Sequence, residues 1–143
     1  GSMASVAYHL HNQLKDNDFI KLFKGSDGYS DGEQRRDFIY IDDIVKVNLW
    51  FMENKEISGI FNLGTGKSRT FNDVAQAVIN WNRKGKIEYI DFPEKLKGSY
   101  QSHTEANISK LRKAGYNESF IDVSEGVNLY LDTLENWPKN DPS

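Results

Sequence analysis

Residues 64–68, with the sequence GTGKS, end in the Gly-Lys-Ser of a phosphate-binding loop. Such a loop needs an earlier glycine, five positions before its second Gly, because that glycine lets backbone amides wrap a phosphate. Phe61 holds this position inside an apolar run, so the wrapping turn cannot form there. Residues 64–66 also fail as a dinucleotide fingerprint, since the third glycine would fall at Arg69. The sequence therefore predicts a tight turn between a strand and a helix, and no nucleotide hydrolase.

The other chemistry-bearing side chains do not form a recognisable site on spacing alone. Asp42 and Asp43 resemble a carboxylate pair for general acid–base work, but adjacent carboxylates before an apolar helix are usually caps. The three histidines, His9, His11 and His103, lack the spacing of metal ligands, so we expect no metal. The absence of cysteine excludes a disulfide framework, a thiolate metal site and a Cys nucleophile.

Composition limits the classes of protein further. At 143 residues, with 38% hydrophobic residues, the chain can build one ordinary domain, and we expect it to cover residues 1–137 with a frayed tail at 138–143. The formal charge of −3 gives no general attraction to nucleic acid or to an anionic membrane. The longest apolar run, residues 49–52, is too short to cross a bilayer. We expect a cytoplasmic protein.

Short strands alternating with helices predict an α/β fold. Strands are expected at 19–23, 37–41, 60–63 and 86–90, and helices at 3–14, 44–51, 74–81, 108–114 and 123–137. Asp42 or Asp43 is expected to cap the helix that buries Leu49 with its apolar neighbours, and Thr70 with Asp73 resembles a capping box.

Two linked stretches indicate a family: RRDFIYIDD at 35–43, followed by FNLGTGKSRTF at 61–71. In this order they resemble the C-terminal half of the extended short-chain dehydrogenase/reductase enzymes that act on nucleotide sugars. Within that superfamily the chain is most similar to the ADP-glyceromanno-heptose 6-epimerases, through GSMASVAYHL at 1–10, KLFKGS at 21–26, IEYIDFPEKLKGSYQ at 87–101 and LRKAGY at 111–116. The resemblance covers nearly the whole chain.

The resemblance implies a C-terminal substrate-binding part whose Rossmann half is absent. These enzymes interconvert the D-glycero and L-glycero forms of ADP-manno-heptose by transient oxidation at the sugar C6, using NADP, for lipopolysaccharide core synthesis. Neither a Gly-rich loop opening a βαβ unit nor a Tyr-x-x-x-Lys pair occurs in this sequence. We therefore expect the catalytic residues upstream of Gly1, the NADP site outside this chain, and no turnover by the isolated chain.

The resemblance also implies a substrate site. Ser2 and His9 match positions that touch substrate in the family, and their spacing of seven puts them on one side of a helix. The alternative for His9 is a surface histidine on an amphipathic helix. Phe23, Lys24, Gly25 and Ser26 match a Phe-Glu-Gly-Ser loop in which an aromatic ring and main-chain groups can hold a base and its ribose. Because Lys24 replaces the family's Glu, backbone contacts are expected there and carboxylate contacts are not.

Two further residues complete the expected substrate site. Arg36 matches the family's arginine at the nucleotide-sugar pyrophosphate, where the fork of a guanidinium fits phosphate oxygens. Its alternative is a surface ion pair with Asp37 or Glu33. Tyr100 matches a tyrosine that contacts substrate; the alternative is a loop tyrosine packed over the core.

Three functional hypotheses follow from these matches. The first is the substrate-binding portion of an ADP-heptose 6-epimerase that takes an ADP-sugar and forms a homo-oligomer. The second is another nucleotide-sugar epimerase or dehydratase, which preference for UDP or dTDP sugars would indicate. The third is a non-catalytic module that binds nucleotide sugars, which the missing cofactor half would suit.

Overall fold

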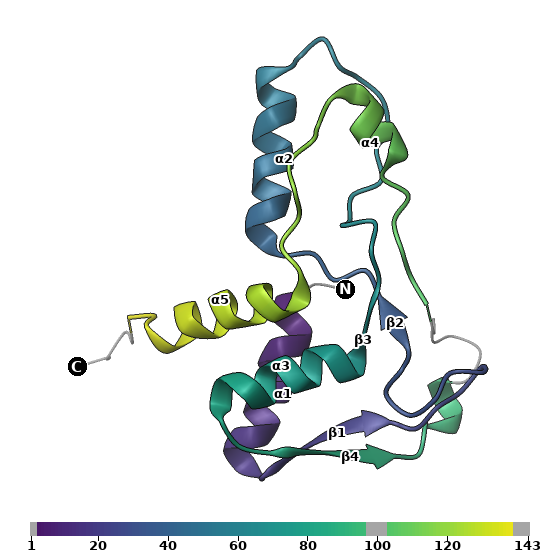
Figure 1. The fold of residues 1–143 in the computed structure, drawn as a ribbon, viewed down its shortest axis with the longest axis vertical. Helices are drawn as coiled ribbons and strands as arrows, with labels where there is room; N and C mark the ends of the chain where they lie inside the picture. The colour runs from purple at the N-terminus through teal and green to yellow at the C-terminus, as the bar shows by residue number, and fades with distance from the viewer. Residues whose placement is uncertain (1–2, 97–102, 139–143) are drawn as a thin grey trace.

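The first helix forms because Met3, Ala7, Leu10 and Leu14 recur at helical spacing and are buried on one face. The fold comes from a computed structural model that describes residues 3–96 and 103–138 (Figure 1). Its helices are α1 (Met3–Asp16), α2 (Ile41–Glu53), α3 (Phe71–Asn82), α4 (Ser109–Ala114) and α5 (Val123–Glu135), with a short 3-10 helix η1 (Glu94–Leu96). Its strands are β1 (Phe19–Phe23), β2 (Arg35–Arg36), β3 (Arg69–Thr70) and β4 (Lys86–Ile90).

The strands form two small pairs. β1 lies parallel to β4, with Phe19 opposite Lys86 and Phe23 opposite Ile90, while β2 runs antiparallel to β3. The first pair leads into the loop that follows Phe23, and the second joins the two motifs that indicated the family. The sheets therefore bring together segments that lie far apart in the sequence.

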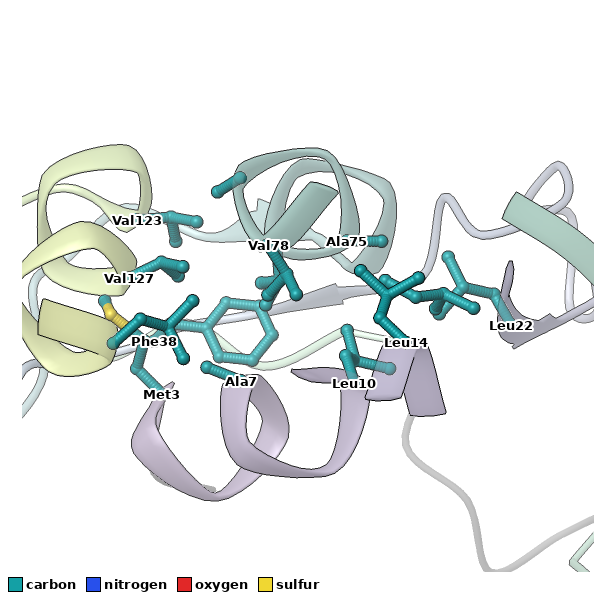
Figure 2. Packing of buried hydrophobic residues seen from close by; sticks show 14 of the residues in the cluster. Met3, Ala7, Leu10, Leu14, Leu22, Phe38, Ala75, Val78, Val123 and Val127 are labelled. Atoms are coloured by element: carbon teal, nitrogen blue, oxygen red, sulfur yellow. The ribbon is translucent and has the colours of Figure 1, made fainter. Parts of the chain in front are cut away.

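The main hydrophobic core lies among α1, α3 and α5, which pack side by side (Figure 2). Figure 2 shows Phe38 in the middle of this core, between Ala7 of α1 and Val78 of α3. Phe38 is 2% exposed and its ring meets Phe71 edge-on at 5.6 Å. Burying such a ring contributes about 1.5–3 kcal/mol, so the RRDF segment is anchored by its fourth residue.

A second, smaller cluster joins α2 to α4. Val47, Leu111 and Tyr116 form its buried part, and the rings of Trp50 and Phe61 pack against it. Figure 1 shows α2 and α4 projecting together from the unit built by α1, α3 and α5. The described residues thus form two hydrophobic clusters, connected through the segments on either side of β2 and β3.

The local patterns located most elements correctly. Helix 3–14 and strands 19–23 and 86–90 are confirmed. The capping box is present in both directions, since the Thr70 hydroxyl accepts from the Asp73 N–H and the Asp73 carboxylate accepts from the Thr70 N–H. Gly115 ends α4 in the left-handed conformation that glycine favours.

Two predicted strands are wrong. The paired residues are 35–36, and residues 37–40 form no strand because Asp37 turns toward the glycine loop and Phe38 into the core. Residues 60–63 also form none: Ile60 is 88% exposed, and within the described ranges no strand lies beside this segment. Apolar side chains made both segments resemble strands, but a strand also needs a partner for its backbone groups.

The predicted cap of α2 is also wrong. The helix begins at Ile41 after Tyr40, and no side chain caps it. Asp43, which is 1% exposed, uses its carboxylate to accept from the Ile121 N–H at 2.7 Å, joining α2 to the turn before α5. Leu49, expected on the buried side, is 51% exposed.

Candidate functional site

The glycine turn that resembles a phosphate loop is already filled by an anion of the protein itself. The Asp37 carboxylate accepts hydrogen bonds from the N–H groups of Thr65 (2.9 Å), Gly66 (3.0 Å) and Ala106 (3.0 Å), and from the Thr65 hydroxyl (2.7 Å). A Cβ added to Gly64 would lie 2.8 Å from an Asp37 oxygen, and Gly66 has a φ of +78°. The glycines therefore let the turn approach the carboxylate.

Arg35 and its neighbours reinforce the same junction. The Arg35 Nε donates to the Ser68 hydroxyl at 2.9 Å, and its Nη2 donates to the Ser68 carbonyl. The Ser68 N–H donates to the Glu105 carboxylate at 2.9 Å, and this hydrogen bond lowers the pKa of Glu105. His103 also lies 3.3 Å from the Ser68 hydroxyl. Ser68 is 3% exposed and shares its hydroxyl with Arg35, so the Ser–His contact is structural and cannot serve as a nucleophile pair.

Arg36 points away from this junction, toward α3. Its guanidinium lies over the Phe71 ring at 5.5 Å, and its Nη1 donates to the Arg35 carbonyl at 2.8 Å. Among the described residues no ion pair joins Arg36 to Asp37 or to Glu33; the Asp37 carboxylate accepts from the glycine turn and the Glu33 carboxylate accepts from Asn72. The side chain is half-buried at the base of α3.

Next to Phe71 lies a cavity of about 380 Å³. Its lining comes from α1, β1, the residue before β2 and the first residue of α3, and consists of Val6, His9, Leu10, Gln13, Lys21, Leu22, Phe23, Gln34 and Phe71. His9 and Phe23, two of the residues expected at the site, therefore face the same space. Arg36 does not line this cavity, but it contacts Phe71, which does. A mostly apolar cavity with a few polar groups is typical of small-molecule sites.

The loop after Phe23 is tightly folded. The Gly25 N–H donates to the Asp31 carboxylate at 2.8 Å, and a Cβ at this glycine would lie 1.9 Å from the Tyr29 carbonyl oxygen. The Ser26 hydroxyl is buried and has no hydrogen-bond partner within the described chain. A buried hydroxyl without a partner is uncommon, and a ligand could satisfy it. Lys24 forms an exposed ion pair with Asp91 at 3.2 Å.

Asn72, in the first turn of α3, holds the far end of this loop. Its amide donates to the Asp31 carbonyl and to the Glu33 carboxylate, while its backbone N–H donates to Gly32. Burial raises the pKa of Tyr89, whose hydroxyl donates to the Asn72 side chain at 2.8 Å. The start of α3 therefore fixes both the loop and the position of Arg36.

Sequence reasoning missed Gln34 as a site residue. Gln34 is 2% exposed, lines the cavity, and donates from Nε2 to the Lys24 carbonyl at 3.1 Å. Its position directly before the two arginines was the available signal. Two predicted site residues, Ser2 and Tyr100, lie outside the described residues.

Neither a metal site nor a membrane span emerges from the described chain. Across residues 3–96 and 103–138, no three His, Asp or Glu side chains come together to hold an ion. In the same ranges, no helix has the length and apolar character needed to cross a bilayer.

Comparisons with known proteins agree with one another. Residues 1–64 match the model of the NAD dependent epimerase/dehydratase family. An ADP-L-glycero-D-manno-heptose-6-epimerase from Alkalilimnicola ehrlichii is 52% identical over 143 residues, which are 100% of this chain and 45% of the relative. The matching part is C-terminal in that relative.

Solved structures show the same fold. The ADP-L-glycero-D-manno-heptose-6-epimerase of Helicobacter pylori is 26% identical with a TM-score of 0.73, over 92% of this chain and 38% of that one. A UDP-glucose 4-epimerase from Thermus thermophilus, in complex with NAD, is 18% identical with a TM-score of 0.71, over 93% and 40% of the two chains. The chain spans less than half the length of these relatives.

Proposed function

Because the chain belongs to the NAD-dependent epimerase/dehydratase family and corresponds to the C-terminal part of an epimerase, we propose that it is the substrate-binding part of an ADP-glyceromanno-heptose 6-epimerase. The observation that carries this proposal is that His9 and Phe23 line one cavity, while the Arg36 guanidinium lies over the ring of Phe71, which lines the same cavity. The substrate is ADP-heptose, and the reaction inverts its sugar C6.

The contacts around the cavity suit the parts of a nucleotide sugar. The Phe23 ring, edge-on to Phe92 at 5.1 Å, offers an aromatic surface for the adenine. Main-chain groups of residues 24–26 and the Ser26 hydroxyl face the ribose, and the Arg36 fork binds the diphosphate. His9 approaches from α1. Ser2 and Tyr100 are added to the site on the family resemblance alone.

The cofactor is bound elsewhere. The Gly64–Gly66 turn cannot cradle a dinucleotide phosphate, because the Asp37 carboxylate occupies its amides. We therefore propose that NADP, which takes up and returns a hydride in such enzymes, is held with the catalytic residues outside this chain. The isolated chain then binds substrate without turning it over.

An exposed face of α2 supports the same arrangement. Ile41, Val45, Leu49 and Met52 are 56%, 48%, 51% and 66% exposed, and their spacing places them on one side of the helix. An apolar stripe of this kind usually marks a contact surface. We propose that it packs against the cofactor-binding part. The proposed setting is cytoplasmic lipopolysaccharide core synthesis by a homo-oligomeric enzyme.

Arg36→Lys tests the substrate site, in the protein as the cell makes it. The lysine keeps the charge and loses the fork, so we expect the affinity for an ADP-sugar, measured by titration calorimetry with ADP-mannose as the probe, to fall at least about tenfold. Lys84→Gln is the control. Lys84 is exposed, and the substitution removes a single exposed ion pair, with Asp18 at 3.9 Å. Equal affinities in the two variants would refute the role of Arg36, and preference for UDP or dTDP sugars would indicate another nucleotide-sugar enzyme.

A further inference from the structure

A second cavity, of about 190 Å³, lies between the glycine turn, α4 and the turn before α5. Its lining is Thr65, Lys67, Arg69, Arg112, Ser119, Phe120, Ile121 and Asp122. None of these residues lines the cavity of His9 and Phe23. Three cationic side chains and two hydroxyls thus surround a space that the proposed function does not use.

Arg112 is held in place without a carboxylate. Its Nη1 donates to the carbonyls of Tyr116 (2.8 Å) and Glu118 (2.7 Å), and its guanidinium lies over the rings of Tyr116 (6.0 Å) and Phe120 (5.0 Å). Within the described ranges no acidic group pairs with it. These contacts leave the Nε and Nη2 donors available, and the guanidinium stays charged at any physiological pH. The free donors of a fixed guanidinium suit the oxygens of an anion.

The carboxylate in this cavity is already committed. Asp122 accepts from the Arg69 Nε at 2.9 Å and from its Nη2 at 3.0 Å, and it also accepts from the Val123 N–H at the start of α5. This pair cancels one positive charge. The Lys67 ammonium forms no hydrogen bond or ion pair with the described part of the chain. The Lys67 ammonium also acts on the same carboxylate through space, so the lining carries three positive charges and one negative charge in a chain whose net charge is −3.

We propose that this cavity binds a phosphate dianion between the Arg112 guanidinium and the Lys67 ammonium, with the Ser119 hydroxyl as a further ligand. The net charge of +2 on the lining of Lys67, Arg69, Arg112 and Asp122 matches the charge of a dianion, and the fork of an arginine matches phosphate oxygens. The phosphate is either inorganic or the terminal phosphate of a nucleotide. The site is separate from Arg36 and does not depend on the proposed epimerase function.

Calorimetric titration with inorganic phosphate at low ionic strength tests the site, using the protein as the cell makes it. Lys67→Gln is the deciding variant, because no described hydrogen bond depends on that ammonium. We expect phosphate to bind at least about tenfold more weakly in Lys67→Gln and in Arg112→Gln, since each removes a charged ligand. Arg36→Gln should bind phosphate as the wild type does. Absent binding, or equal binding in Lys67→Gln, would overturn the proposal, as would a loss confined to Arg36→Gln.

A second titration, with adenosine 5′-monophosphate in the Arg36→Gln variant, distinguishes the two sources of phosphate. Tighter binding of the nucleotide than of inorganic phosphate, lost on adding Lys67→Gln, would identify a nucleotide site. Binding of inorganic phosphate alone would identify a site for the free ion. Nucleotide-sugar affinity measured in Lys67→Gln is expected to match the wild type, so this site and the proposed function can fail independently.

Discussion

Replacing Asp37 by Asn tests how strongly the internal carboxylate stabilises the glycine turn. In the structure one carboxylate oxygen accepts from the N–H and hydroxyl of Thr65, and the other accepts from the N–H groups of Gly66 and Ala106. An asparagine has the same shape but only one oxygen. Whichever way its amide turns, its NH₂ group faces at least one backbone N–H that had an acceptor.

The magnitude follows from the bonds that are lost. If the amide oxygen stays near Gly66 and Ala106, the Thr65 hydroxyl can rotate to accept, and one N–H loses its partner. The reverse orientation leaves two N–H groups without a partner. A hydrogen bond to a charged group contributes about 1.5–3 kcal/mol, and the retained bonds weaken with the loss of charge. We expect the free energy of unfolding to fall by about 2–4 kcal/mol.

Urea denaturation followed by tryptophan fluorescence measures this difference. Asp42→Asn is the matched control, because Asp42 is an exposed carboxylate in the same motif and makes only the general contribution of an acidic residue in the first turn of α2, about 0.3–1 kcal/mol. The Asp37→Asn midpoint should lie clearly below the control, with an unchanged slope. Coincident unfolding curves for the two variants would show that the carboxylate does not support the turn.

Two further predictions concern α3 and α1. Thr70→Ala removes one half of the capping box and should lower the free energy of unfolding by about 1 kcal/mol. Thr133→Ala is the control, because the Thr133 hydroxyl only donates to the Leu129 carbonyl within α5, and it should lower the free energy of unfolding less in the same urea assay. An equal loss in the two variants would contradict the role of the cap. Burial, together with Lys15, lowers the pKa of His11 from 6.5, and the favourable contacts with Asn82 and Glu135 do not offset this. The folded state therefore favours neutral His11, so stability should be complete above pH 6.5 and fall as the pH drops below it. His11→Gln should flatten the dependence of the free energy of unfolding on pH between pH 7 and 5. An unchanged slope in this variant would show that His11 does not cause the dependence.

Local patterns predicted the elements whose formation depends on nearby residues. The apolar spacing of α1, the alternation in β1 and β4, and the Thr70–Asp73 cap each act within a few residues, so the sequence shows them directly. The strands expected at 37–41 and 60–63 do not form, because a strand also depends on residues that are distant in the sequence. Their side chains suited a strand, but the residues that donate to the Asp37 carboxylate lie 28 or more positions away.

The candidate site was likewise predictable only in part. The motif order indicated the family, and the cavity does bring His9 and Phe23 together. Nothing in the spacing predicted that Gln34 would be buried and hold the Lys24 carbonyl, or that Asn72 would fix the loop after Phe23. These contacts join residues ten to 41 positions apart, and only the packing of α1, β1 and α3 selects them.

Residue types at fixed short spacings were enough to indicate the family, to locate the local helices and two of the strands, and to exclude a phosphate-binding loop at 64–68. What fills the glycine turn depends instead on the packing of distant segments. The amides of Thr65 and Gly66 could bind any anion, and the Asp37 carboxylate takes that place because Phe38, the next residue, is buried among α1, α3 and α5. The burial of one aromatic side chain thus positions the charge beside it.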